Sequence, residues 1–135
     1  MPDLVALELI RLAKANPVME ICGMITEGWE VWEIPNVSDN PLHSFFMDPQ
    51  RMLHVIRTHR TSIIGVYHSH PNGCTVPTPD DIKGWNPNLP WRYFIIADDQ
   101  VLEFKRLPDD KVQCIYTGPT EDLAAQVHEG RKGER

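Results

Sequence analysis

Two histidines separated by one residue, His68 and His70, stand at the end of an apolar, β-branched run, SIIGVYHSHP. Such a run predicts a central strand, in which residues two apart point to the same face with Cα atoms roughly 6.6–7 Å apart. Two imidazoles that project together can converge on one metal ion at zinc–nitrogen distances of about 2.0–2.1 Å. Because Pro71 ends the strand directly afterwards, we expect the pair at a strand terminus that faces a loop, where an open site can form.

A metal site needs a third ligand, because a His-x-His pair also arises by chance among surface residues. Asp81 follows His70 by eleven residues, beyond a loop long enough to fold back. Two histidines and one carboxylate leave the fourth tetrahedral position of zinc to water, as in catalytic rather than structural sites. The run Thr78-Pro79-Asp80-Asp81 is also a sound helix start, with a hydroxyl N-cap, proline at the first position and acids in the first turn. The two interpretations are compatible, since the cap can position the ligand.

The segments that must position these residues are predicted from their periodicity. Residues 3–15 indicate an amphipathic helix with Asp3 as its N-cap, and Asp48-Pro49 indicates the start of a second helix. MEICGMITEG and WEVWEIPNVS indicate two strands, and RYFIIADD, QVLEFKRL and KVQCIYTG indicate a strand and a β-meander. One more short helix is expected after Pro119, followed by a frayed polar end.

Composition restricts the classes of protein that fit. The chain has 135 residues, a formal net charge of -6 and a pI near 5.4, which fits one globular domain and argues against a nucleic-acid binder with a basic face. No apolar run reaches the roughly 18 residues of a membrane helix and no signal peptide is evident, so the cytoplasm is the expected location. The three cysteines are widely spaced and odd in number, which predicts free, mostly buried thiols.

The string HSHPNGCTVPTPDD resembles the signature of the JAMM (MPN-plus) metalloproteases, which is His-x-His-Pro, six residues, then Ser-x-x-Asp. The matching positions are His68, His70, Pro71, Thr78 and Asp81. Upstream, PVMEICGMI is similar to the family's strand segment Pro-x-Glu-x-Cys-Gly and places Glu20 at its glutamate. With PNVSDNPLHSFFMDP the resemblance covers about residues 4–116. Threonine replaces the family's usual serine, which keeps a hydroxyl but restricts χ1.

This resemblance implies an α/β domain over residues 1–118 with the MPN/JAMM (cytidine-deaminase-like) fold, a mixed central β-sheet flanked by helices, and a short helix and frayed tail over residues 119–135. It implies one catalytic Zn²⁺. The site residues carried over by matching the motif are Glu20 as acid and base, Thr78 as donor to the oxyanion, and His68, His70 and Asp81 as metal ligands. Asp80 remains as a charge in the first turn of the helix.

By the same resemblance, the expected activity is that of a zinc metallopeptidase. Its substrate would be a peptide or isopeptide bond after the Gly-Gly C-terminus of a ubiquitin-like or sulfur-carrier β-grasp protein. The short chain is similar to compact prokaryotic or phage-type members. Two alternatives stay open: a hydrolase of phage-tail or cell-wall peptides, and a non-catalytic MPN scaffold that binds partners without zinc. Neither nucleic acid nor membrane is an expected partner.

Other residues near the motif have ordinary interpretations. Cys74 lies between the ligands in sequence and is interpreted as a loop cysteine, and Trp85 and Trp91 suit either a substrate groove or core packing. Four histidines match no ligand spacing and are interpreted as packing or surface residues: His43, His54, His59 and His128.

Overall fold

The computed structural model describes residues 1–119, and within them it forms one six-stranded sheet with three α-helices. The helices are α1 (Asp3–Ala15), α2 (Pro49–His59) and α3 (Pro79–Gly84). The strands are β1 (Cys22–Thr26), β2 (Glu30–Ile34), β3 (Ile63–Ser69), β4 (Arg92–Ala97), β5 (Gln100–Arg106) and β6 (Val112–Gly118). Each strand lies inside the segment that the sequence predicted for it. The short helix expected beyond Pro119 lies outside the described residues.

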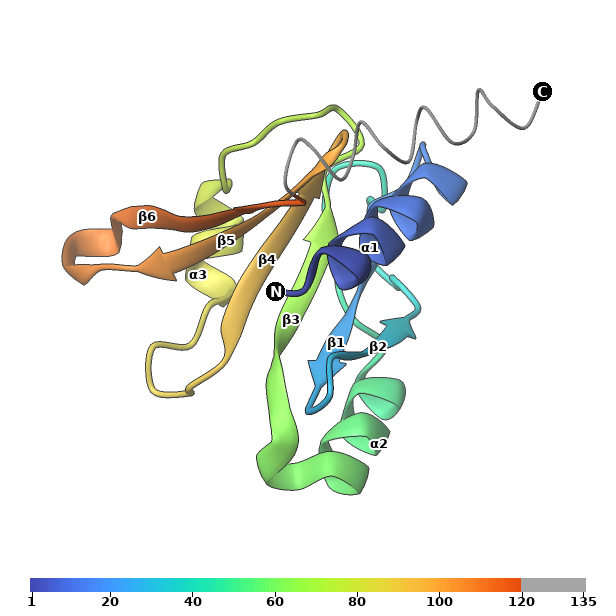
Figure 1. The fold of residues 1–135 in the computed structure, drawn as a ribbon, viewed down its shortest axis with the longest axis vertical. Coiled ribbons are helices and arrows are strands. Elements are labelled where there is room, and N and C mark those ends of the chain that lie inside the picture. Colours follow the sequence, from blue (N-terminus) through green and yellow to red (C-terminus); the bar gives the residue numbers. More distant parts are fainter. Residues whose placement is uncertain (120–135) are drawn as a thin grey trace.

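The sheet is mixed, with the strand order β2-β1-β3-β4-β5-β6 (Figure 1). Strands β3 and β4 are parallel, and every other neighbouring pair is antiparallel. Because parallel strands run in one direction, the C-terminal ends of β3 and β4 lie on the same side of the sheet. The histidine pair therefore lies at the C-terminal end of β3, where the loops that follow β3 and β4 are close together. A mixed central sheet flanked by helices is the predicted α/β class.

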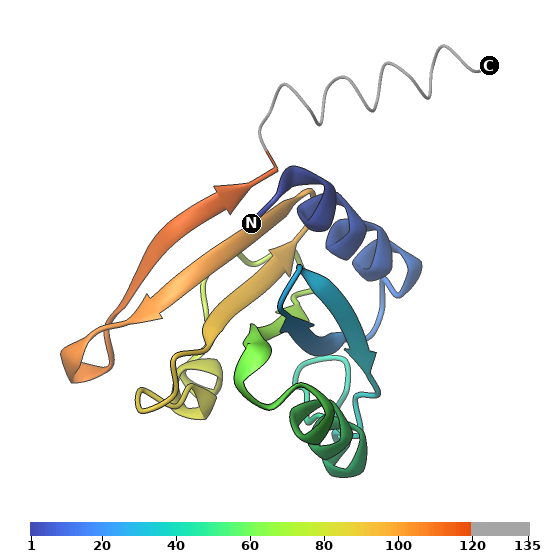
Figure 2. The same cartoon turned by 60° about the horizontal axis from the view of Figure 1, so that its bottom comes forward.

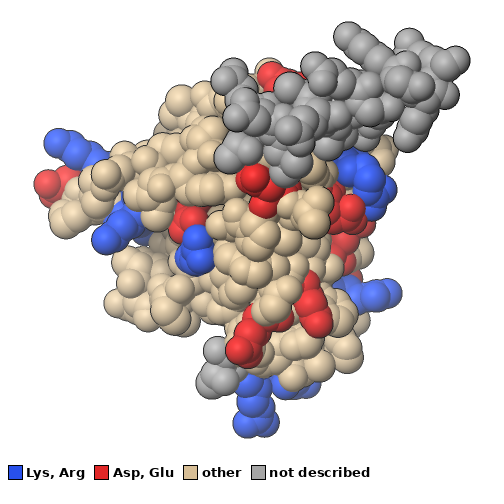
Figure 3. All heavy atoms as spheres, viewed as in Figure 1, with Lys and Arg blue, Asp and Glu red and all other residues tan. Residues whose placement is uncertain are grey.

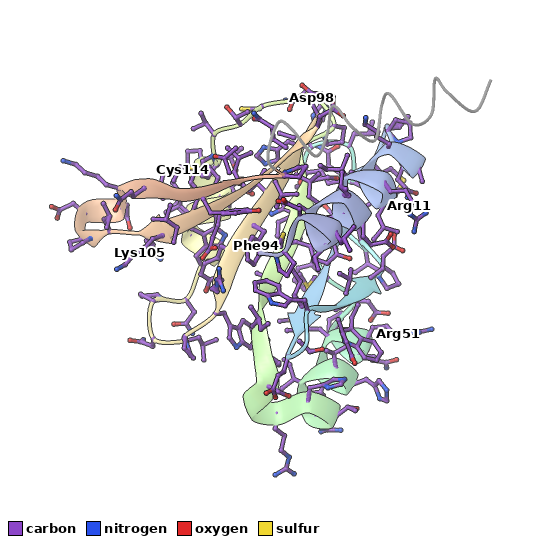
Figure 4. All side chains as sticks on the ribbon, viewed as in Figure 1. Arg11, Arg51, Phe94, Asp98, Lys105 and Cys114 are labelled. Atoms are coloured by element: carbon purple, nitrogen blue, oxygen red, sulfur yellow. The ribbon has the colours of Figure 1, made fainter. Side chains whose placement is uncertain are left out.

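Helix α1 covers one face of the sheet, whereas α2 and α3 cover the other (Figures 1 and 2). On the α1 face, Ala6 and Leu9 pack with Tyr67 and Phe94 in one buried cluster, and Phe94 is labelled in the middle of β4 in Figure 4. Side chains alternate along a strand, so the neighbour of Tyr67, His68, faces the opposite side. That side is where the metal-ligand candidates gather.

The face shared by α2 and α3 holds two apolar clusters. Val55 of α2 packs with Met24 and Ile34, while Trp85 after α3 packs with Ile95 and Phe104. Helix α2 starts as predicted, because the Asp48 side chain accepts the Gln50 N–H and Pro49 is the first helical residue.

The predicted N-cap of α1 was wrong by one residue. The N-cap is Pro2, which makes no side-chain cap hydrogen bond, and Asp3 is the first helical residue. An acid in the first turn still interacts favourably with the helix dipole, so the helix begins where the sequence pattern placed it without the expected cap.

The cysteines are free, as predicted, but they are not mostly buried. Cys22 is buried in β1, whereas Cys74 and Cys114 are exposed. Cys74 lies in the loop after β3 and Cys114 lies on β6, which is an edge strand. Exposure follows from these positions, which cysteine spacing does not reveal.

The surface carries charges of both signs. On the face drawn in Figure 3, Lys and Arg side chains are interspersed with Asp and Glu side chains, in a chain with a formal net charge of -6. Within residues 1–119, none of the helices has the length and apolar character that crossing a membrane requires.

Candidate metal centre and active site

Three of the predicted site residues meet at the end of β3. The Nε2 atoms of His68 and His70 lie 3.1 Å apart. The Asp81 carboxylate contacts both rings, with Oδ1 3.2 Å from the His68 Nε2 and Oδ2 3.1 Å from the His70 Nε2. All three side chains are nearly inaccessible, with exposed fractions of 3%, 5% and 9%. The fold thus brings three side chains, His68, His70 and Asp81, into mutual contact, and we call this cluster the triangle.

The start of helix α3 places the Asp81 carboxylate. The Thr78 Oγ1 accepts the Asp81 N–H at 3.1 Å, and the Asp81 Oδ2 accepts the Thr78 N–H at 2.9 Å, which together form a capping box. Pro79 is the first helical residue. The carboxylate is therefore part of the cap and in contact with both imidazoles, so the two interpretations of this segment hold together.

The loop after β3 orients His70. Its Nδ1 lies 2.8 Å from the Cys74 carbonyl oxygen. A carbonyl only accepts hydrogen bonds, so Nδ1 carries the proton, and in the neutral ring the Nε2 lone pair faces Asp81. The loop turns at Gly73, whose φ is +76° and where an added Cβ would lie 2.6 Å from the Asp98 Oδ2. Because L side chains rarely adopt this positive φ, the turn favours glycine. The Asp98 side chain that an added Cβ would meet is exposed and follows β4, where Figure 4 labels it.

An aromatic ring from a different loop packs on His68. The Phe45 ring is stacked on the imidazole, with 4.4 Å between centroids and 22° between planes. Phe45 belongs to the segment between β2 and α2. This stacking restricts the orientation of the His68 ring. The stacking was not predicted from the sequence, because the resemblance covered the whole segment and gave Phe45 no particular role.

Glu20 is held beside the triangle by its backbone. Its N–H donates to the Pro41 carbonyl at 2.8 Å, and its carbonyl accepts from the Asn36 side-chain amide at 2.9 Å. Its side chain is buried, and Oε1 has no hydrogen-bond partner among the described residues. A ligand atom of Glu20 lies within 4.8 Å of those of His68 and His70. The family pattern implied that Glu20 lies within a strand. In the structure it precedes the first residue of β1 by two positions.

Burial and neighbouring charge shift the pKa values of these groups in different directions. Burial, reinforced by the Asp81 charge, raises the pKa of Glu20 to about 7. Burial lowers the pKa of His68. Burial would also lower the pKa of His70, but the Asp81 carboxylate and the Cys74 carbonyl outweigh it, so the net shift is upward. The two imidazoles outweigh the effect of burial on Asp81 and hold its pKa well below the usual range.

The buried Glu20 carboxyl is expected to make the metal-free protein less stable as pH rises. Its pKa is about 7 in the folded protein against an ordinary 4.5, so the folded state binds this proton more tightly. The free energy of unfolding therefore falls as pH rises from the unfolded pKa through the folded pKa, by at most about 3 kcal/mol.

Urea denaturation of zinc-free wild type and Glu20→Gln measures this effect. The variant lacks the titrating group and keeps His70 and Asp81, so its stability relative to wild type should increase between about pH 5 and pH 8. A difference that does not change with pH would contradict the raised pKa.

Two hollows open on either side of the triangle. The first, of about 350 Å³ and called here the Glu20 hollow, is lined by residues that include Glu20, His43, His70, Asn72, Cys74 and Thr78. The second, of about 510 Å³ and called the aromatic groove, is lined by residues that include His43, Phe45, Phe46, Thr78, Asp81 and Trp91. The first hollow thus reaches His70 and the second reaches Asp81.

Both tryptophans near the motif border the aromatic groove. Trp85 is also a core residue, 4% exposed and stacked on Tyr93 with 4.9 Å between centroids, so core packing and groove lining coexist there. Cys74 enters the site through its backbone carbonyl. His59 packs against Trp32, with 4.9 Å between ring centroids, as a packing residue should.

Comparison with known proteins decides the family. A model of prokaryotic homologues of the JAB domain matches residues 2–108. The chain belongs to this family. The MPN/JAMM resemblance and its α/β fold are thereby confirmed.

Two relatives of this JAB-domain chain illustrate the match. A Thermus thermophilus protein named as a probable TtuB-protein conjugate cleaving protease is 35% identical over 74 residues, which are 53% of this chain and 49% of that protein. The match thus spans about half the length of that relative. The solution structure of a Desulfitobacterium hafniense protein covers 79% of this chain and 82% of its own, with a TM-score of 0.62 and 24% identity, and it supports the fold alone.

Proposed function

We propose that this JAB-domain chain is a zinc-dependent metallopeptidase with one catalytic domain over residues 1–118. Its substrate would be the peptide or isopeptide bond after the Gly-Gly C-terminus of a ubiquitin-like β-grasp protein. The observation that carries the proposal is the buried triangle of His68, His70 and Asp81, with the unpaired Glu20 carboxyl beside it.

The donor atoms of the triangle suit zinc. Ligands of tetrahedral zinc at about 2.0–2.2 Å stand roughly 3.3–3.5 Å from one another. The two imidazole nitrogens lie 3.1 Å apart, and each contacts a different oxygen of the Asp81 carboxylate, at 3.2 and 3.1 Å. In neutral His70 the Nε2 lone pair faces the Asp81 oxygen, so two acceptors lie 3.1 Å apart. A cation satisfies both, and the fixed Nδ1 tautomer is the one that a metal ligand needs. We therefore assign His68, His70 and Asp81 as ligands, because the Asp81 carboxylate contacts both rings. Glu20, whose ligand atom lies within 4.8 Å of those of both histidines, is the alternative third ligand.

The roles of the remaining residues follow from their positions. Zinc, when bound, supplies an acidified water and polarises the scissile carbonyl. Glu20 accepts a proton from the attacking water and donates it to the departing amine. The lack of a protein partner leaves the Glu20 carboxyl available to water.

Thr78 is proposed to donate a hydrogen bond to the oxyanion. The cap uses only an acceptor lone pair of its Oγ1, so the hydroxyl hydrogen remains available, and Thr78 borders both hollows. Thr78→Ala is expected to lower kcat by about 10- to 1000-fold and to lower stability by about 1 kcal/mol.

Thr78→Ser is the control for both effects, because it keeps the cap and the donor. Kinetics and urea denaturation of both variants should show Ser close to wild type in each measure. If Thr78→Ala loses stability but keeps kcat, the residue acts as a cap and not as an oxyanion donor.

The substrate assignment is supported by the Thermus thermophilus relative, whose name describes cleavage of TtuB-protein conjugates. A chain ending in Gly-Gly also suits the physical setting. Without side chains it can approach closely the residues that the two hollows share, and its main chain remains open to hydrogen bonding.

Cleavage by the zinc-loaded wild type tests the proposal. The substrates are β-grasp domains joined through Gly-Gly to a peptide or to a lysine side chain, matched fusions with Ala-Ala at the junction, and peptidoglycan fragments. We expect cleavage after Gly-Gly and little after Ala-Ala. Cleavage of peptidoglycan fragments alone would favour a wall-peptide hydrolase, and failure to bind added zinc would favour a scaffold.

A further inference from the structure

The Glu20 hollow and the aromatic groove share two lining residues, His43 and Thr78. The two residues come from different loops, His43 from the segment between β2 and α2 and Thr78 from the segment between β3 and α3. His70 lines one hollow and Asp81 lines the other. The hollows therefore adjoin at His43 and Thr78, which define the junction, and each hollow is lined by one residue of the triangle.

When the scissile bond of a substrate reaches the triangle, the substrate chain continues on both sides of that bond and so extends away from the junction in two directions. An extended chain advances roughly 3.3 Å per residue, so the residues next to the scissile bond are the ones that can reach the lining of the junction, His43 included. The main chain of those residues presents N–H and C=O groups in alternation. An imidazole offers one donor and one acceptor, and it can therefore pair with an extended backbone.

The His43 segment is fixed in place rather than loosely attached. The His43 N–H donates to the Asn40 carbonyl at 3.1 Å. The Asn36 side chain donates a hydrogen bond to the Ser44 carbonyl and accepts one from the Phe46 N–H, each at 3.0 Å. Phe45 stacks on the His68 ring. An exposed imidazole is thus carried by a turn that is tied to one of the proposed metal ligands.

We propose that His43 is a substrate-binding residue that hydrogen-bonds the extended main chain of the substrate beside the scissile bond. The inference rests on the proposed peptidase function, because it takes the junction as the place where the bond is cut. It adds a contact that the sequence motif does not contain.

The test uses binding and turnover together. Binding of a β-grasp–Gly-Gly–peptide fusion is measured on zinc-loaded Glu20→Gln, and turnover is measured with Glu20 in place. His43→Leu keeps the size of the side chain and removes its hydrogen bonds. It is expected to raise Kd and KM about five- to tenfold, to change kcat less than KM, and to leave zinc content at the wild-type level.

Two further variants make the result specific. His43→Gln restores a donor and an acceptor and should recover most of the lost affinity. His54→Leu is the matched control, because His54 is exposed on α2 and borders neither hollow, and it should bind and turn over as wild type does.

The outcomes separate this inference from the proposed function. If His43→Leu binds and cleaves as wild type does, or if His43→Gln is as impaired as His43→Leu, the inference is wrong and the peptidase function stands. If the fusion binds with the expected dependence on His43 but the wild type leaves it uncut, the binding role stands and the proposed function is wrong.

Discussion

Zinc-loaded Glu20→Gln is expected to keep its metal and to lose about 100- to 10,000-fold in kcat. Glutamine matches glutamate in size but cannot accept and return a proton. The Glu20 backbone is anchored by Pro41 and Asn36, so the substitution should leave the position of the side chain unchanged. Zinc analysis of the purified protein and turnover of the Gly-Gly fusion at saturating substrate measure the two effects.

A neighbouring glutamate provides the control for this experiment. Glu27 is exposed at the turn between β1 and β2, and Glu27→Gln changes the net charge by the same amount at a distance from the hollows. It should retain wild-type kcat and zinc content. Full activity in Glu20→Gln would remove Glu20 from the chemistry, and loss of zinc in that variant would make Glu20 a ligand instead.

Asp81→Asn is expected to lower zinc affinity by more than about 100-fold and to abolish turnover at ordinary zinc concentrations. Asparagine keeps an oxygen that can accept the Thr78 N–H, so the start of α3 is preserved while the anionic ligand is lost. His68→Ala should also lose the metal, but it removes the ring against which Phe45 packs. The asparagine variant is therefore the cleaner measurement.

Asp80→Asn is the matched control for Asp81→Asn. Asp80 is exposed in the same first turn of α3, so this variant removes an identical charge without touching the triangle. Competition with a zinc chelator should give wild-type affinity for Asp80→Asn. If Asp80→Asn loses zinc and Asp81→Asn retains it, the ligand is Asp80 and the assignment of Asp81 is wrong.

Local sequence was sufficient for the interactions that build the motif. The capping box of α3 involves residues three apart, and the two histidines share a face because side chains alternate along β3. The strands were predictable because alternation and β-branched residues report which segments are buried. Two predictions were wrong. Pro2 occupies the N-cap position predicted for Asp3. Cys74 and Cys114 are exposed rather than buried, because one lies in a loop and the other on an edge strand.

The composition of the site beyond its motif depended on tertiary structure. Glu20 was proposed from resemblance alone, and its burial and its missing hydrogen-bond partner follow from packing across the sheet. His43 and Phe45 have no spacing that marks them, yet the loop between β2 and α2 brings one to the junction of the hollows and stacks the other on His68. Spacing along the chain therefore determined His68, His70 and Asp81 as candidate ligands, because a strand and a capped helix start fix directions over a few residues. Only the fold decided what surrounds them, because burial, pKa and access depend on segments that are distant in sequence.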